Sequence, residues 1–139
     1  MSSFSGPYVR ISAPELSFEQ RKIMARELTE AISDVLQLNP HQTEALQVQF
    51  CSYRMDAMAV GGRLLSETEE PHYCLEILGS HLFPDRQEAL GRRLLPLMLE
   101  LVSLPAHEEN RVSLIFNEIS KWNGKTSAQF VGEPSRSLR

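Results

Sequence analysis

Two cysteines and four histidines are the residues of this sequence whose types most often bind metals or act as nucleophiles. They are Cys51, Cys74, His41, His72, His81 and His107. Their spacing matches neither a zinc finger nor the HExxH motif, although His72, Cys74 and His81 are near enough in sequence to meet at one ion. We interpret the two histidines as isolated polar residues at strand ends, and both cysteines as small buried strand residues. Two cysteines are also too few for a disulfide scaffold, so we predict no metal and no cofactor.

Motifs for phosphate binding and serine nucleophiles are absent from the sequence. It contains no P-loop, GxGxxG or GxSxG pattern, and Gly61-Gly62 is typical of a flexible turn. The 14 basic and 18 acidic side chains give a net charge of −4, which disfavours non-specific nucleic-acid binding. No apolar run approaches the roughly 20 residues of a membrane helix, and residues 1–6 lack the features of a signal peptide. We expect a cytoplasmic protein with no nucleic-acid or membrane partner.

The elements that would position any site form a repeat, which begins with a strand, a helix and a second strand. Residues 8–13 alternate between apolar and polar side chains, which predicts a strand. Ser17-x-x-Gln20 is a capping box, and apolar residues at three- and four-residue spacing predict a helix from Ser17 to Leu36. Asn39-Pro40 ends this helix. Residues 46–51 alternate again, which predicts a second strand.

The second half of the chain repeats this order of elements. Residues 73–78 and 112–117 alternate like strands, and an apolar stripe between them predicts a helix with a cap at Asp85-x-x-Glu88. Pro96 predicts a kink in this helix or its division into two pieces. We expect one domain over residues 1–139. Its parts are a leader (1–6), a first repeat (7–64), a connector rich in glycine and acid (61–70), a second repeat with a closing segment (71–131) and a tail (132–139).

These elements predict an α/β (α+β) fold with a four-stranded sheet and two helices. A helical connection between neighbouring strands makes them parallel. Both helices should cover one face of the sheet, because each has a single apolar stripe. The opposite face would carry a mixture of polar and apolar side chains, among them Tyr8, Arg10 and Glu76. Since sheets with parallel strands are usually covered on both sides, we predict a homo-oligomer.

These residues together resemble the tautomerase superfamily. Pro7-Tyr-Val-Arg-Ile11 is similar to the family's opening strand, which begins with proline, and the segment from Arg26 to Ser33 is similar to the family helix. Leu46 to Phe50, followed by Met58 to Gly62, resembles the second strand and its glycine turn. Residues 7–64 are most similar to 4-oxalocrotonate tautomerase. The whole chain resembles fused-repeat members such as 5-carboxymethyl-2-hydroxymuconate isomerase and macrophage migration inhibitory factor.

The resemblance implies a homotrimer with sites between subunits that bind a small carboxylate. In this family an N-terminal proline is the general base, because its secondary amine takes a proton next to a carbonyl. Pro7 would be catalytic if processing made it N-terminal. The resemblance also suggests Arg10, Arg54, Met58 and Arg63 as residues that bind substrate.

Two functions therefore remain open. With Pro7 exposed, the chain would be a keto-enol isomerase of a small unsaturated or aromatic acid. With residues 1–6 attached, the nitrogen of Pro7 is a tertiary amide without basicity. The family's expected functional residues are also replaced at Leu16, Gln47 and Met58. These replacements favour the alternative, a non-catalytic trimer that binds a small ligand or a protein. Catalysis by Tyr53, Cys51 or Glu76 is a third possibility, although each is read more simply as a strand residue.

Overall fold

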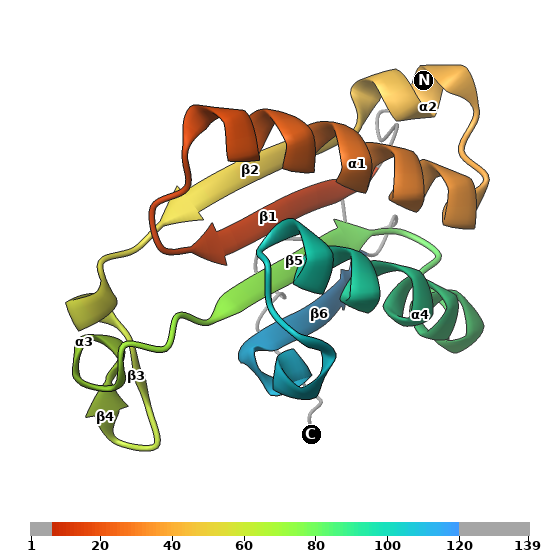
Figure 1. Cartoon of the computed structure of the whole chain (residues 1–139). Helices are drawn as coiled ribbons and strands as arrows, with labels where there is room; N and C mark the ends of the chain where they lie inside the picture. The colour runs from red at the N-terminus through yellow and green to blue at the C-terminus, as the bar shows by residue number, and fades with distance from the viewer. Residues whose placement is uncertain (1–6, 120–139) are drawn as a thin grey trace.

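The computed structural model describes residues 7–119, which form a sheet, two long helices and a projecting hairpin (Figure 1). In chain order, the elements are β1 (Tyr8–Ala13), α1 (Phe18–Leu36), α2 (Pro40–Ala45), β2 (Gln47–Ser52), a 3-10 turn (Met55–Ala57), β3 (Ala59–Val60), β4 (Arg63–Leu64), α3 (Leu65–Thr68), β5 (Tyr73–Gly79), α4 (Pro84–Leu101), a 3-10 segment (Ala106–Arg111) and β6 (Val112–Glu118). The predicted leader, the predicted tail and residues 120–131 of the closing segment lie outside the described residues.

The four-stranded sheet has the order β2-β1-β5-β6, which confirms the predicted fold. Within each repeat the two strands are parallel, and their partners are 39 positions apart in both cases, as Tyr8 with Gln47 and Tyr73 with Val112 show. The two repeats join through the antiparallel pair β1–β5, in which Tyr8 lies beside Leu78. Both α1 and α4 cover the same face of the sheet (Figure 1).

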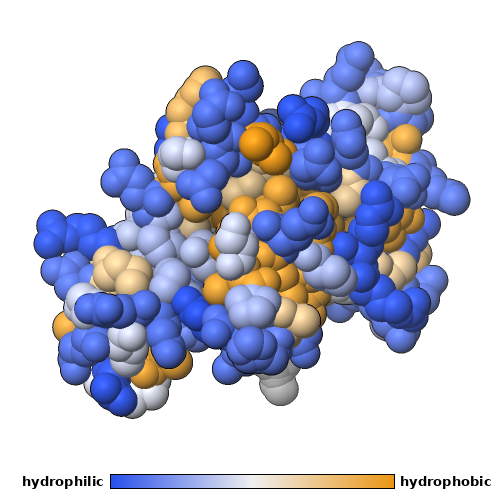
Figure 2. All heavy atoms as spheres, in the orientation of Figure 1, coloured by the Kyte–Doolittle hydropathy of each residue, from blue (hydrophilic) through white to orange (hydrophobic). Residues whose placement is uncertain are grey.

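The core lies between this face of the sheet and the two helices. The strands contribute Val9, Ile11, Ala13, Leu75 and Ile77, and the helices contribute Met24, Leu28, Ala31, Ile32, Leu90, Leu94 and Met98. Figure 2 shows apolar atoms gathered near the middle of the helical face, with hydrophilic side chains around them. Burial of each large apolar side chain stabilises the fold by about 1.5–3 kcal/mol relative to exposure, so this layer fixes which strand residues face away from the helices.

The helix ends agree with the sequence in the first repeat and differ in the second. The Ser17 hydroxyl accepts the backbone N–H of Gln20, and the Gln20 side chain accepts that of Ser17, so the predicted capping box is confirmed. The predicted cap at Asp85 is wrong, because α4 begins at Pro84, and Phe83 takes the N-cap position without a side-chain hydrogen bond. The division of the helix at Pro96 is also wrong, since α4 runs from Pro84 to Leu101.

The Asn39-Pro40 pair, which was predicted to end the first helix, also begins a short helix that the sequence did not predict. Asn39 caps α2 through a reciprocal pair of hydrogen bonds with Gln42, and Pro40 occupies the first turn, where its missing N–H costs nothing. The α1 helix itself ends one turn earlier, with Gln37 in the left-handed conformation at φ 55°. One proline therefore both follows one helix and begins the next.

The connector between the repeats is a hairpin followed by a single helical turn. Gly61 and Gly62 have φ values of 63° and 83°, which a two-residue turn with positive φ at both positions requires. The β3–β4 hairpin projects from the sheet (Figure 1), while Leu65 anchors the next turn with a buried side chain. No helix among residues 7–119 is long and apolar enough to cross a membrane.

Candidate functional site

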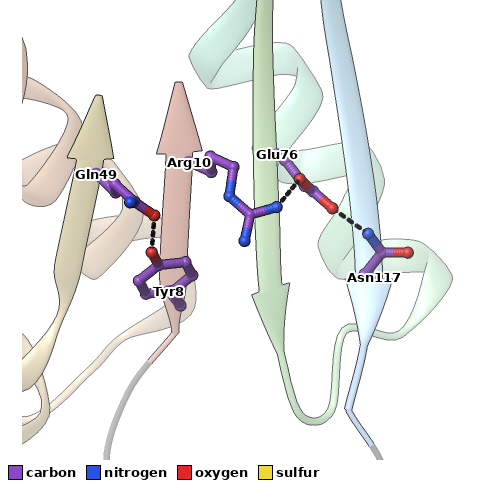
Figure 3. A network of polar contacts seen from close by, with 5 residues as sticks. All are labelled: Tyr8, Arg10, Gln49, Glu76 and Asn117. Atoms are coloured by element: carbon purple, nitrogen blue, oxygen red, sulfur yellow. Dashed lines mark hydrogen bonds and ion pairs between the residues drawn. The ribbon is translucent and has the colours of Figure 1, made fainter. Parts of the chain in front are cut away.

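Polar side chains from all four strands form a network on the sheet face opposite the helices, which we call the open face (Figure 3). The Tyr8 hydroxyl donates to the Gln49 side chain. Arg10 Nη1 donates to Glu76 Oε1 at 3.0 Å, and Oε2 of the same carboxylate accepts from the Asn117 amide. The Arg10 guanidinium also lies 5.7 Å from the centre of the Tyr8 ring. Arg10, which the family resemblance assigned to substrate binding, is therefore already paired with a carboxylate of the second repeat.

Pro7 lies at the start of β1 and is buried. A Cβ built on Gly79, at the end of β5, would lie 3.4 Å from Pro7 Cβ and 3.9 Å from Leu82 Cδ1. Because Gly6 precedes it, the Pro7 nitrogen belongs to an amide, whose lone pair is delocalised and not basic. In this chain Pro7 is a packing residue at the junction of the two repeats.

Arg54, Met58 and Arg63 lie beyond the opposite end of β1 from Pro7. All three follow β2, which runs parallel to β1. They therefore lie beyond the C-terminal end of β1, whereas Pro7 directly precedes its N-terminal end. Six strand residues span about 20 Å. The structure therefore does not bring these three residues to Pro7 within one subunit.

Two of the candidate arginines differ in how their guanidinium groups are used. Arg54, whose side chain is 83% exposed, donates through Nε and Nη2 to the two oxygens of Asp56 at 3.1 and 3.0 Å. This pairing lowers the pKa of the Asp56 carboxyl and raises the pKa of Arg54. Arg63, on β4, is exposed and forms no ion pair with any residue of the described segment 7–119. The Nε and Nη2 atoms of Arg54, which could bind both oxygens of a carboxylate ligand, are therefore already bonded to Asp56.

The positions that depart from the family pattern lie in three different environments. Leu16 is part of the hydrophobic core, and its carbonyl accepts a 2.7 Å hydrogen bond from Arg21 Nη1. Gln47 is exposed beside Tyr8 at the start of β2. Met58 is half-buried, and its carbonyl accepts the backbone N–H of Leu65 at 2.9 Å. None of the three supplies a cation or an aromatic ring.

Cys74 and Tyr53, two of the other side chains considered as nucleophiles, are held in their protonated forms by burial. Ser12 lies between Cys51 and Cys74, with one cysteine on each neighbouring strand. Two strand spacings separate the cysteines by roughly 9.5 Å, beyond the roughly 7 Å limit between Cα atoms of a disulfide. Burial raises the pKa of the Cys74 thiol, and the Glu76 carboxylate raises it further. Burial likewise raises the pKa of Tyr53, whose hydroxyl is bound to the backbone of His72.

In the described part of the chain, the potential metal ligands do not gather at one point. His72 and His81 lie at opposite ends of β5, and residues 7–119 contain no group of three potential ligands that could hold a metal ion. A shallow surface cavity lies at the end of α1, lined in part by Ser33, Asp34 and Arg93. Four of its polar side chains already pair with one another, since Arg93 pairs with Asp34 at 2.9 Å and the Ser33 hydroxyl bonds to Thr43.

The loop from Ser80 to Phe83 directly follows Gly79, the residue that lies against Pro7. Of its residues, only His81 was considered from the sequence, as a possible metal ligand. Its His81 and Phe83 rings pack edge to face at 5.6 Å, and Arg86 from the first turn of α4 lies 5.3 Å from the centre of the Phe83 ring. We call His81, Phe83 and Arg86 the loop cluster. The loop lies at the Pro7 end of the sheet because β1 pairs antiparallel with β5, which no local sequence pattern specifies.

Comparison with known families matches the first repeat of the chain. A family model described as "Tautomerase enzyme" matches residues 7–67, so the match begins at Pro7. No curated protein matches the chain.

Solved structures of fused and related tautomerases share the fold. Native fused 4-OT is 14% identical with a TM-score of 0.71, and the alignment covers 89% of this chain and 98% of that chain. Pt0534 inactivated by 2-oxo-3-pentynoate is 19% identical with a TM-score of 0.70, over 84% and 88% of the two chains. The macrophage migration inhibitory factor-like protein of Entamoeba histolytica is 18% identical with a TM-score of 0.65, over 84% and 91%. Residues 7–67 match the tautomerase family, and the described chain shares the fold of these solved structures.

Proposed function

We propose that this chain, with residues 1–6 attached, is a homotrimeric member of the superfamily that binds a small carboxylate without proline-based turnover. The observation that carries the proposal is the state of Pro7. Its nitrogen is an amide and its ring is buried against Gly79. A general base needs an accessible lone pair whose pKa is near the working pH, and Pro7 offers none.

The positions of the arginines support a site shared between subunits. Arg54 and Arg63 lie beyond the end of the sheet opposite Pro7, so they reach a Pro7 only if it belongs to another copy. Two solved structures of similar fold carry titles that describe a fused 4-OT as an asymmetric trimer, at 13% and 14% identity. The half-buried open face would be covered in such an assembly.

Isomerase activity is the second candidate, and one observation favours it. The family match begins at Pro7, the residue that would become the N-terminus if the chain were cleaved after Gly6. Cleavage would convert the tertiary amide into a secondary amine, which could move a proton between carbon and oxygen of a conjugated acid. Arg10, Arg54 or Arg63 would hold the carboxylate of that acid.

Three chains separate the two functions. They are the full sequence, a chain whose initiator methionine directly precedes Pro7 and is removed, and the same short chain with Pro7→Ala. Each is checked by intact mass and assayed for ketonisation of phenylenolpyruvate. We expect the full sequence to ketonise phenylenolpyruvate no faster than the Pro7→Ala chain does. A free proline base would raise this rate by about 10²–10⁴-fold.

Turnover by the full sequence at its intact mass, abolished by Pro7→Ala in that same chain, would contradict the proposal. Activity confined to the chain that begins at Pro7 would show that the leader masks a competent base. Intact mass of the protein from its native source would then decide which form acts.

A further inference from the structure

The loop cluster holds an arginine whose carboxylate-binding edge has no partner in the described part of the chain. Arg86 Nη1 donates to the His81 carbonyl at 3.1 Å. Its Nε and Nη2 make no hydrogen bond to residues 7–119, and Arg86 forms no ion pair there. These two nitrogens form the side of the guanidinium that binds both oxygens of a carboxylate.

Arg86 differs from the other arginines of the described chain because its guanidinium has an aromatic contact and no carboxylate partner there. Arg21 and Arg63 also form no ion pair within residues 7–119, and Arg21 Nη1 donates to the Leu16 carbonyl, but neither guanidinium lies over an aromatic ring of that segment. Arg54 donates from its Nε and Nη2 atoms to Asp56, and Arg10 donates from Nη1 to Glu76. Arg92, six residues further along α4, pairs with Glu88 at 2.9 Å. Arg86 is instead bound to a neutral carbonyl, so its charge is not neutralised by a carboxylate of the described chain.

The loop cluster also holds this arginine in one orientation. The Phe83 ring, 45% exposed, covers one side of the guanidinium, and the His81 ring packs against the same phenyl group. His81 adopts φ 60°, a left-handed conformation that is unfavourable for a non-glycine residue. An exposed ring beside a fixed cation offers an apolar contact and a charged contact to one ligand.

We propose that Arg86 binds the carboxylate of the ligand and that Phe83 contacts its apolar or unsaturated body. This inference rests on the proposed ligand-binding function and names a residue of the site. The loop that carries these residues directly follows Gly79, which lies against Pro7, so the anion would bind at the Pro7 end of the sheet within one subunit. Arg86 therefore replaces Arg54 as the cation that recognises the ligand, because the Nε and Nη2 atoms of Arg54 already bind Asp56.

The test measures binding of trans-cinnamate, an unreactive planar carboxylate, and of its neutral amide, to the full chain by calorimetry or NMR titration. We expect cinnamate to bind more tightly than cinnamamide. Arg86→Gln should weaken cinnamate binding about 10-fold or more, because charge-assisted hydrogen bonds are lost, and should leave cinnamamide binding unchanged. Phe83→Ala should weaken both ligands.

Arg92→Gln is the matched control, since it removes an exposed arginine from the same helix, and it should bind like the unmodified chain. Circular dichroism and light scattering verify that each variant keeps its fold and assembly. Unchanged cinnamate affinity in Arg86→Gln, with loss in Arg63→Gln or Arg10→Gln, would overturn the assignment of Arg86 and leave the proposed function intact. If the unmodified chain binds neither compound, both the inference and the ligand-binding function fail.

Discussion

At the scale of single residues, what a charged side chain can do is decided by which of its atoms are already bonded. Glu76 illustrates this, because its two oxygens accept from Arg10 and from Asn117 on opposite neighbouring strands. Its negative charge also acts on the nearby thiol of Cys74, two residues earlier on β5. The open face thus contains one carboxylate that influences both a cation and a thiol.

This coupling predicts the reactivity of Cys74. Glu76→Gln removes a negative charge that disfavours the thiolate, so the pKa of Cys74 should fall, and alkylation should begin at lower pH. The rate of alkylation by iodoacetamide is measured against pH in a Cys51→Ser background, where one thiol remains. Glu44→Gln, a distant exposed acid, serves as the control. An identical pH profile for the Glu76→Gln and control chains would show that the carboxylate does not act on the thiol.

At the scale of elements, the two repeats preserve matching contacts as well as matching strands. The backbone N–H of Tyr53 donates to the Ala13 carbonyl at 3.0 Å, and that of Ile119 donates to the Gly79 carbonyl at 2.7 Å, 66 positions later. Side chains in the first turns of the helices repeat a contact in the same way. Arg21 bonds to the Leu16 carbonyl at 2.7 Å, and Gln87 bonds to the Leu82 carbonyl at 2.8 Å. Each repeat therefore closes its strand–helix loop by the same means, although few side chains are identical.

The stability of α1 depends on its capping box. Ser17→Ala removes an acceptor for the N–H of Gln20 and should lower the free energy of unfolding by about 1 kcal/mol. Chemical denaturation at one fixed protein concentration measures the change, because assembly makes stability depend on concentration. Ser66→Ala, at an exposed serine in α3, should change stability by less than about 0.5 kcal/mol. Equal stability of Ser17→Ala and the unmodified chain would mean that water replaces the cap.

The sequence specified the elements better than it specified the site. Alternation and the Ser17 capping box are local signals, so β1, α1 and their counterparts were predicted close to their observed bounds. Pro40 permits two local outcomes, a helix end and a helix start, and α2 was missed for that reason. The loop cluster and the Arg54–Asp56 pair depend on tertiary packing and on side-chain rotamers, which residue spacing does not determine.

At the scale of the whole molecule, the two faces of the sheet differ in how they are covered. The helices bury one face, whereas the open face carries the Arg10–Glu76 pair, with side chains 40% and 20% exposed. Beside Glu76 in the β5–β6 register lies Ile115, which is 43% exposed. A large apolar side chain next to a half-exposed ion pair is the composition expected of a subunit contact.

Assembly through the open face is therefore open to a direct test. Ile115→Lys places a charge in the expected contact and should dissociate the trimer, because a buried unpaired charge costs several kcal/mol. Light scattering should give about three chain masses for the unmodified protein and about one for Ile115→Lys. Phe18→Lys is the matched control, since Phe18 is a 64% exposed apolar residue at the start of α1 on the helical side. A trimer that survives Ile115→Lys but dissociates with Phe18→Lys would place the subunit contact on the helices instead, and a monomeric unmodified chain would exclude a ligand site built from two copies.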